Sequence, residues 1–283
     1  MEKYKEVERS IITTYRKKIW APFIQAIKEY NLIEENDHIC CCMSGGKDSF
    51  LMAKLLEELE KHSDFPFKVS YLVMNPGYKQ EVEEKIKNNL ELLNIKATIV
   101  KTDVFEIADL KGGKPCFLCA RMRRGILYKE AEKLGCNKIA LGHHFDDVIE
   151  TTLMSMFYNG RIQTMPPKLL SDNYKGMELI RPMYQIHEQD ILNWVKFNDL
   201  SFINCACKFT DSNHNFDSKR AEIKELCKDL KKRNPIICHN IFKSVHRCNI
   251  DTMVGYELDR VYHDFNEEFE RKKANVSKRD SNN

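Results

Sequence analysis

The sequence predicts an α/β protein with a doubly wound parallel sheet and helical additions at both ends. Short runs of β-compatible residues alternate with segments that carry apolar residues at helical spacing, from residue 38 to about residue 180. Two of these runs, 38–43 and 138–141, end in glycine-containing turns that open helical segments. Because parallel sheets bind ligands at the carboxyl ends of their strands, both turns are expected to face one cleft.

The elements can be assigned in order along the chain. Apolar residues at helical spacing predict a helix over residues 4 to about 31, which Pro22 is expected to break or kink. The expected strands are 38–43, 68–74, 97–101, 138–141 and 178–180. The helices expected between and after them are about 50–61, 80–93, 116–134, 142–158 and 221–232. The segment 166–176 is expected to be a loop.

This pattern divides the chain into four parts. They are an N-terminal helical segment (1–31), an α/β domain (32–204), a C-terminal helical region (205–270) and a polar tail (271–283). The charged, polar composition of the tail predicts disorder.

Composition restricts the class of protein. The chain has 283 residues, of which 42% are hydrophobic and 31% charged, as in an ordinary globular protein. No apolar run is long enough for a membrane span, and residues 1–6 lack the apolar stretch of a secretory signal. Eleven cysteines, an odd number, then favour a reducing cytoplasm, with some of them acting as metal ligands or reactive thiols. The net charge of +3 neither requires nor excludes a nucleic-acid partner.

The hexapeptide Ser44–Ser49, Ser-Gly-Gly-Lys-Asp-Ser, is the most informative segment. Its paired glycines, Gly45 and Gly46, let backbone N–H groups crowd round an anion, and the following helix adds its positive dipole end. The loop also offers two hydroxyls, an ammonium and a carboxylate suited to magnesium: Ser44, Ser49, Lys47 and Asp48. The spacing is not that of a Walker A loop. The alternative is a helix N-cap whose glycines serve only the turn.

A second acidic segment, Gly142-His143-His144-Phe145-Asp146-Asp147, follows the fourth expected strand. Two adjacent carboxylates at a helix start can bind magnesium and orient phosphates. The alternative is a pair of carboxylates that the helix dipole favours, with His143 and His144 as structural hydrogen-bonding groups.

The cysteine pair Cys116-x-x-Cys119 lies at an expected helix start, directly before Arg121, Arg123 and Arg124. The dipole and the arginines should favour thiolates, which bind metals or act as nucleophiles. Structural zinc, a redox dithiol and a three-cysteine iron–sulfur cluster are the alternatives, and Cys205 and Cys207 are the downstream candidates for a further ligand. A three-cysteine cluster leaves one iron open to exogenous sulfide. The other cysteines are expected to be structural: Cys40, Cys41, Cys42, Cys136, Cys227, Cys238 and Cys248.

The hexapeptide resembles the signature of the PP-loop ATP pyrophosphatases, and the chain as a whole resembles their tRNA 2-thiocytidine synthetase (TtcA) family. The matching segments are 44–49, 116–128, 138–147, 156–160, 165–169, 180–182 and Cys205. They fall within about residues 30 to 245. The arginine-rich Cys-x-x-Cys helix is the most specific of them.

The resemblance implies a tRNA sulfurtransferase that uses ATP, magnesium and a [4Fe–4S] cluster. Such an enzyme replaces the C2 oxygen of an anticodon-loop cytidine, at position 32, with sulfur, and it releases AMP and pyrophosphate. The implied cluster ligands are Cys116, Cys119 and Cys205, with Cys207 as the alternative third ligand; the region 205–270 would supply that ligand. The implied nucleotide site is Ser44, Gly45, Gly46, Lys47, Asp48, Ser49, Arg123, Gly142, His143 and Asp147, with Asp48 and Asp147 as catalytic residues.

Two departures from the family pattern point to a divergent branch. The turn after the second strand is the short Asn75–Tyr78 where better-known members have a longer loop, and Cys205-Ala-Cys207 replaces a Cys-x-x-Cys. Thiolation of a uridine and lysidine-type ligation are therefore retained as alternatives, although lysidine synthesis needs no cluster. An alternative of another class is a zinc-bearing, nucleotide-sensing RNA-binding module without catalysis.

The expected partners are tRNA and a sulfur donor, either sulfide or sulfur derived from a cysteine desulfurase; no membrane is expected, and a homodimer is one assembly considered. Candidate contacts for tRNA phosphates are the arginines of the Cys-x-x-Cys helix and the basic run 231–233. The alternative for that run is a solvated helix face.

Overall fold

The computed structural model describes residues 2–110, 115–203 and 215–280. Its centre is a six-stranded sheet in the order β3-β2-β1-β4-β6-β5. The strands are β1 (His38–Met43), β2 (Lys68–Asn75), β3 (Ala97–Lys101), β4 (Lys138–Ala140), β5 (Lys168–Leu170) and β6 (Glu178–Ile180). β1 pairs in parallel with β2 and β4, whereas β5 runs antiparallel to β6. The direction of the strand order changes between β1 and β4, which is where open α/β sheets bind ligands.

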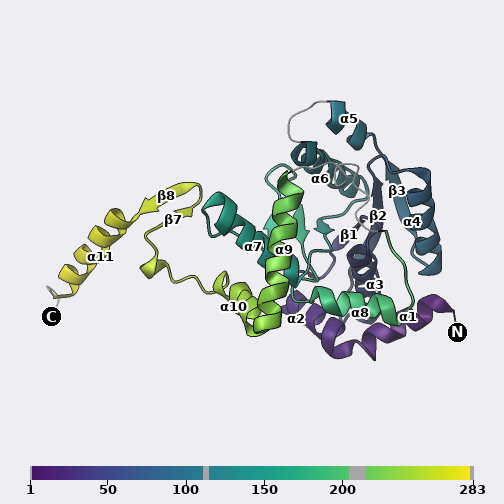
Figure 1. Ribbon diagram of the computed structural model, residues 1–283, viewed down its shortest axis with the longest axis horizontal. Helices are drawn as coiled ribbons and strands as arrows, with labels where there is room; N and C mark the ends of the chain where they lie inside the picture. Colours follow the sequence, from purple (N-terminus) through teal and green to yellow (C-terminus); the bar gives the residue numbers. More distant parts are fainter. Residues whose placement is uncertain (1, 111–114, 204–214, 281–283) are drawn as a thin grey trace.

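Helices cover both faces of this sheet (Figure 1), which confirms the predicted α/β class. Those of the first two thirds of the chain are α1 (Lys3–Ile12), α2 (Ala21–Glu29), α3 (Lys47–His62), α4 (Gln80–Leu92), α5 (Val104–Leu110), α6 (Pro115–Lys133), α7 (Phe145–Asn159) and α8 (Glu188–Phe197). Those of the last third are α9 (Asn215–Arg233), α10 (Ile236–Ser244) and α11 (Phe265–Asp280).

The central strand β1 divides the core because successive side chains of a strand point to opposite faces. Cys41 and Met43 pack in the larger apolar cluster, which α1, α2, α3, α4 and α8 supply. Cys40 and Cys42 pack on the other face, against Tyr128 of α6 and its neighbours. Burial on both sides explains why this strand reads as a continuous apolar run.

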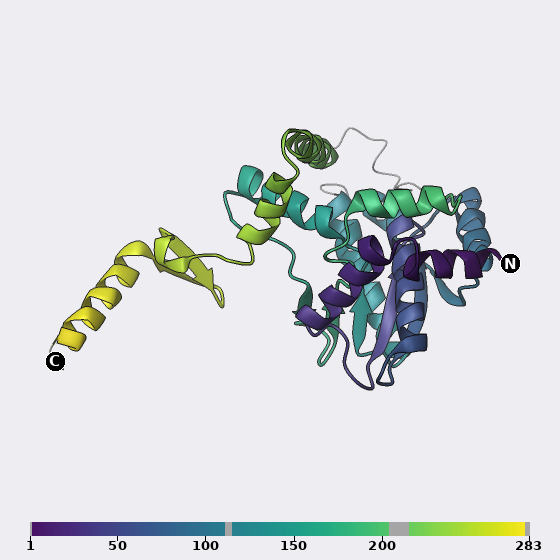
Figure 2. The same ribbon diagram turned by 90° about the horizontal axis from the view of Figure 1, so that it is seen from below.

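A further apolar cluster lies beside the sheet, where α7, α9 and α10 pack together (Figure 2). Val148 and Ile149 of α7 contribute to it, with Ile223 and Cys227 of α9 and Phe242 of α10. All of these side chains are buried. Helix α9 is therefore fixed along α7, which carries the second acidic segment.

The N-terminal segment breaks earlier than the sequence predicted. Helix α1 ends at Ile12, and a five-residue π-helix, Arg16–Trp20, precedes α2. Pro22 lies in the first turn of α2. The missing N–H of a proline costs little in that position, so Pro22 starts a helix where a kink was expected.

Three further elements correct the sequence-based assignments. Strand β5 lies inside the expected loop 166–176; it is a three-residue edge strand, too short to show an alternating pattern. Strands β7 (Gly255–Leu258) and β8 (Val261–Asp264) form a hairpin in the region expected to be helical. Both residues of its turn, Asp259 and Arg260, have positive φ values, 51° and 68°. Such a turn normally carries glycine or asparagine, so the usual sequence signal is missing.

Helix α5 also went unpredicted, and α11 continues to Asp280 through the tail that was expected to be disordered. Ion pairs at i,i+3 spacing lie along the first part of α11: Arg271 with Glu268, and Lys273 with Glu270.

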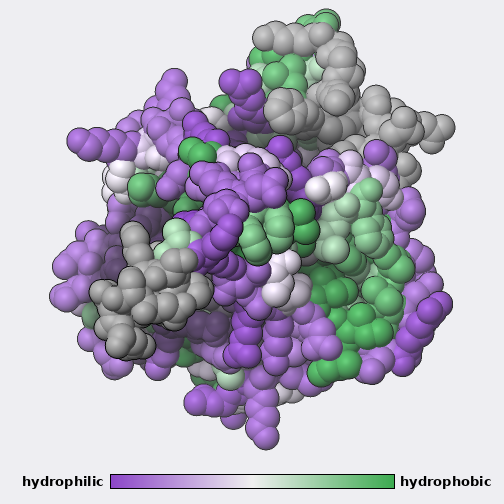
Figure 3. All heavy atoms as spheres, turned by 90° about the vertical axis from the view of Figure 1, so that its left-hand side faces the viewer, coloured by the Kyte–Doolittle hydropathy of each residue, from purple (hydrophilic) through white to green (hydrophobic). Residues whose placement is uncertain are grey.

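The segment from β7 to the end of α11 projects from the rest of the molecule (Figures 1 and 2). It exposes apolar side chains: Leu258, Val261, Tyr262, Phe265 and Phe269. Figure 3, which faces this side of the molecule, shows hydrophobic groups among a mainly hydrophilic surface. No helix in the described ranges is long and apolar enough to cross a membrane.

Candidate active site

The Ser44–Ser49 loop connects β1 to α3 at the carboxyl edge of the sheet. Gly46 is the N-cap residue of α3, and no side-chain cap hydrogen bond forms there. Instead, the Ser49 hydroxyl donates to the Gly46 carbonyl oxygen at 2.8 Å. The first N–H groups of an α-helix have no partner within the helix, so this terminus has donors available for an anion.

Gly45 is required for the shape of this loop. Its φ is +87°, in the left-handed region, and a Cβ there would lie 2.8 Å from the side chains of both Ile86 and Ile203. An alanine would therefore be strained and would push against two apolar side chains.

We expect Gly45→Ala to lower the free energy of unfolding by about 1–2 kcal/mol, because of the left-handed backbone. Displacement of the loop should also weaken ATP binding by about tenfold or more. Thermal unfolding and ATP titration measure the two effects. Gly125→Ala is the matched control, because a Cβ there meets nothing within 4 Å; equal behaviour of the two variants would contradict the prediction.

The second acidic segment lies against the first loop. A Cβ on Gly142 would come within 3.3 Å of the backbone carbonyl carbon of Asp48 and the backbone nitrogen of Ser49. His144 is the N-cap residue of α7, and its N–H donates to Asp147 Oδ2 at 3.0 Å. The two predicted loops thus touch through a residue without a side chain.

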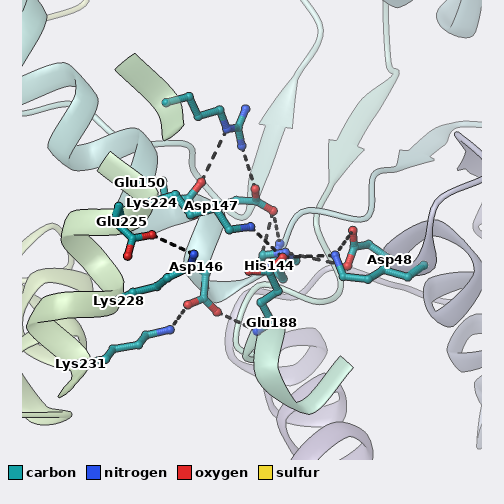
Figure 4. A network of polar contacts seen from close by, with 12 residues as sticks. Asp48, His144, Asp146, Asp147, Glu150, Glu188, Lys224, Glu225, Lys228 and Lys231 are labelled. Atoms are coloured by element: carbon teal, nitrogen blue, oxygen red, sulfur yellow. Dashed lines mark hydrogen bonds and ion pairs between the residues drawn. The ribbon is translucent and has the colours of Figure 1, made fainter. Parts of the chain in front are cut away.

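His144 bridges the two predicted catalytic carboxylates (Figure 4). Its Nε2 lies 3.9 Å from Asp48 Oδ1, and its Nδ1 lies 3.5 Å from Asp147 Oδ2. Burial would raise the pKa of Asp147, but His144, His143, the His144 N–H and Arg220 hold that pKa below its usual value. Asp147 is therefore an anion at neutral pH.

Asp48 offers a carboxylate oxygen that suits a magnesium ion. Asp48 Oδ1 is buried and accepts no hydrogen bond from the described residues, so it is free for a cation. No group of three or more His, Cys, Asp or Glu side chains in the described ranges can hold a metal by itself. Magnesium in nucleotide sites is commonly held by one or two carboxylates together with substrate phosphates, which agrees with this arrangement.

A cavity of about 990 Å³ opens beside the two loops. The predicted residues that line it are Ser44, Gly46, Lys47, Asp48, Arg123 and Asp147. An adjoining pocket of about 310 Å³ is lined by Ser49, Gly142 and His143, together with Ser44, Asp48, Arg123 and Asp147 of the first cavity. The structure therefore brings nine of the ten predicted residues to two neighbouring spaces; of the ten, only Gly45 is absent from both linings.

Sequence reasoning missed five charged residues that border the larger cavity: Lys85 of α4, Glu150 of α7, Glu188 of α8, and Arg220 and Lys224 of α9. Glu188 Oε1 lies 3.3 Å from Lys47 Nζ and 2.9 Å from Lys224 Nζ. Arg220 lies 2.9 Å from Asp147 Oδ1. Charged residues of this kind are common on solvated helix faces, so the sequence held no signal for them.

His143 is held in its neutral form. Its Nδ1 is buried and has no hydrogen-bond partner among the described residues. Burial, as the main cause, lowers the pKa of His143 to about 4 from its ordinary 6.5.

This shift predicts a pH dependence of stability. The folded state disfavours the protonated imidazole, so the contribution is complete above pH 6.5 and is lost as the pH falls toward about 4. Melting temperatures measured between pH 7 and pH 4.5 should fall further for the wild type than for His143→Gln. Parallel curves for the two proteins would contradict the assignment.

The cysteines are only partly within the described structure. Cys119, on α6, is 4% exposed and packs with Val104, Phe105 and Ala108. Arg123, one turn further along α6, lines both cavities, so the cysteine helix borders the site. The side chain of Cys116, and Cys205 and Cys207 altogether, lie outside the described residues.

Several other cysteines are buried thiols. Hydrogen bonding with Cys40 and burial raise the pKa of Cys136, and burial raises that of Cys41. Burial is also the main cause that raises the pKa of Cys227 to about 12. Such thiols are protonated at neutral pH and poorly reactive.

The predicted tRNA contacts differ in availability. Arg121 and Arg124 are exposed on α6. Lys231 instead pairs with the buried Asp146 and ties α9 to α7, so it is not an open phosphate contact. Lys232 is 73% exposed and pairs with Asp229.

Comparisons with known proteins agree with this geometry. The model of the PP-loop domain family matches residues 17–230. The tRNA-cytidine(32) 2-sulfurtransferase of Shewanella sediminis is 35% identical over 94% of this chain and 82% of its own length. The enzyme of the same name from Coxiella burnetii is 35% identical over 90% of this chain and 95% of its own length.

A solved structure is similar in fold. The U34-tRNA thiolase NcsA from Methanococcus maripaludis, solved with its [4Fe–4S] cluster, superposes with a TM-score of 0.64 at 22% identity, covering 84% of this chain and 80% of its own. The family model and the two relatives confirm the family resemblance inferred from the motifs. The chain belongs to the PP-loop domain family and, within it, to the tRNA-cytidine(32) 2-sulfurtransferases.

Proposed function

We propose that this protein is an ATP-dependent tRNA sulfurtransferase that replaces the C2 oxygen of cytidine 32 with sulfur. The substrate is that of the relatives by name. One observation carries the proposal: the Ser44–Ser49 loop, Asp147 and Arg123 of the cysteine helix border one cavity. A phosphate-binding loop, a carboxylate for a metal and the helix of the predicted cluster are therefore within reach of one substrate.

The Ser44–Ser49 loop and the N-terminus of α3 hold the phosphates of ATP, with Lys47 adding a positive charge. Asp48 and Asp147 hold magnesium, which offsets the negative charge of the phosphates. The target cytidine is turned out of its stack, because an enzyme cannot reach C2 inside one. These groups place the C2 oxygen and the α-phosphorus of ATP together in the cavity.

The reaction then takes two steps. The C2 oxygen attacks the α-phosphorus, the bond to the β-phosphate oxygen breaks, and pyrophosphate leaves with the electron pair. A sulfur nucleophile attacks C2 of the adenylated base, and AMP leaves with the original oxygen. Cys116, Cys119 and Cys205, with Cys207 as the alternative third ligand, would hold a [4Fe–4S] cluster, which would supply an open iron for sulfide. The apolar surroundings of Cys119 suit such a cluster, because they limit solvent access.

The same proposal assigns the partners and the compartment. The sulfur comes from sulfide or from a cysteine desulfurase. It works in the cytoplasm, where thiols stay reduced; Cys40, Cys41, Cys42, Cys136, Cys227, Cys238 and Cys248 are free thiols.

Mass analysis of tRNA nucleosides from a deletion strain tests the substrate. We expect 2-thiocytidine to disappear and to return with the wild-type gene but not with an Asp48→Asn gene. Loss of a thiolated uridine would move the activity to another base, and loss of lysidine would replace it with ligation. Metal analysis of anaerobically purified protein separates the catalytic function from an RNA-binding module: iron with acid-labile sulfide supports the enzyme, and zinc alone contradicts it.

A further inference from the structure

Helix α9 carries three basic side chains on the face that lies against α7 and α8. Arg220, Lys224 and Lys231 are spaced by four and seven residues, which places them on the same side of a helix. Each forms an ion pair with a carboxylate of α7 or α8: Arg220 with Asp147, Lys224 with Glu188 and Lys231 with Asp146. Figure 4 shows the lysines of this row against the acidic residues.

The pair of Lys231 and Asp146 is structural. Asp146 is 6% exposed, and its second oxygen accepts a hydrogen bond from the N–H of Glu188 at 2.7 Å. Neither residue lines the cavity of about 990 Å³. The apolar residues Ile223 and Cys227 of α9 are buried as well. Helix α9 is therefore held in place without the other two pairs.

Arg220 and Lys224 are different, because both line the cavity and both are about half exposed, at 48% and 43%. Lys224 and Lys47 of the Ser44–Ser49 loop contact the same carboxylate oxygen. Glu188 Oε1 lies 2.9 Å from Lys224 Nζ and 3.3 Å from Lys47 Nζ. A single anionic oxygen thus bridges the loop and α9. A phosphate oxygen in that position would make the same two contacts.

Arg220 pairs with Asp147, the carboxylate proposed above to hold the magnesium of the bound nucleotide. Its guanidinium lies 2.9 Å from Asp147 Oδ1, and its Nε lies 3.6 Å from Glu150 Oε2. With Asp147 holding a metal ion, the guanidinium would keep only the longer contact with Glu150, and its other N–H groups would be available to a phosphate. A guanidinium matches the geometry of phosphate oxygens well.

We propose that Arg220 and Lys224 bind the β- and γ-phosphates of ATP, exchanging Asp147 and Glu188 for phosphate oxygens when the nucleotide enters. This inference rests on the proposed use of ATP. When the bond between the α-phosphorus and the bridging oxygen breaks, the electron pair stays on the departing pyrophosphate. The two cations stabilise the charge that develops there, and no proton has to move.

Calorimetric titration of the full chain with ATP, pyrophosphate and AMP, each with magnesium, tests the inference. Arg220→Gln and Lys224→Gln should each weaken ATP and pyrophosphate binding by about tenfold or more, as expected for loss of a charge-assisted hydrogen bond. AMP binding should change by less than about twofold, because AMP lacks the leaving phosphates, and tenfold corresponds to about 1.4 kcal/mol. Arg220→Lys should retain part of the affinity that Arg220→Gln loses.

Lys228→Gln is the matched control. It removes the same charge from the same helix, but Lys228 pairs with Glu225 at 2.9 Å and does not line the cavity. Its affinity for all three ligands should equal that of the wild type.

Four outcomes would overturn the inference. Equal losses for AMP and ATP would mean that the two cations only maintain the shape of the site. Unchanged nucleotide binding with weaker tRNA binding would make them tRNA contacts. Wild-type protein that binds neither ATP nor pyrophosphate would remove the proposed function together with this inference, whereas retention of both ligands by the variants removes the inference alone.

Discussion

Replacing Asp48 with asparagine is expected to lower the rate of tRNA thiolation by about 10²–10³-fold. The change keeps the shape of the side chain and removes its charge. Asp48 Oδ1 is buried without a hydrogen-bond partner among the described residues, while Oδ2 lies 3.1 Å from Lys47 Nζ. The variant should therefore lose a magnesium ligand while the fold is retained. Its half-maximal activity should require a higher magnesium concentration than that of the wild type.

Asp229→Asn is the control for this prediction. It makes the same substitution at an exposed carboxylate, which pairs with Lys232 at 3.2 Å on the surface of α9. Activity, magnesium dependence and melting temperature should all match the wild type. A thiolation rate for Asp48→Asn within about threefold of the wild type would remove Asp48 from the catalytic residues.

Replacing Cys119 with serine is expected to abolish thiolation and to remove the iron of the anaerobically purified protein. Cys119 is 4% exposed in an apolar surrounding, and serine there is a poor ligand for iron because it lacks the soft thiolate. The absorption of the cluster and the acid-labile sulfide should disappear together. ATP binding should change little, because the phosphate loop belongs to a different element.

Cys136→Ser tests whether a buried thiol elsewhere has the same effect. Cys136 is 6% exposed and packs on the face of the sheet that α6 covers. Its iron content and activity should equal those of the wild type once melting temperatures show that both variants are folded. Full iron content in Cys119→Ser would show that Cys119 is not a cluster ligand and that other residues hold the iron.

The strongly apolar strands were predictable from sequence because their burial leaves a local trace. The expected range 38–43 coincides with β1, in which five of the six residues are buried. A run of buried residues that ends in a glycine-containing turn identifies both a strand and the loop after it. For the same reason the Ser44–Ser49 and 142–147 loops could be expected at one edge of the sheet.

The site residues and elements that were not predicted depend on contacts or backbone conformations that leave no pattern in the local sequence. Arg220 reaches Asp147 from a helix that begins at residue 215, and nothing in the composition of that helix marks it as part of the site. The hairpin of β7 and β8 was missed because Asp259 and Arg260 adopt a backbone more typical of glycine and asparagine. Pro22 was read as a break, since its position within a helix depends on where the preceding helix ends.

The close contact at Gly142 determines how a nucleotide can enter. With only 3.3 Å between the place of a missing Cβ and the backbone of α3, the two loops have no slack between them. No side chain can lie between them. The same cavity is bordered by Arg220 and Lys224 of α9, whose side chains are about half exposed. Exposed side chains reorient within nanoseconds, so these two can turn aside as a nucleotide enters, whereas the backbone contact at Gly142 offers no comparable freedom.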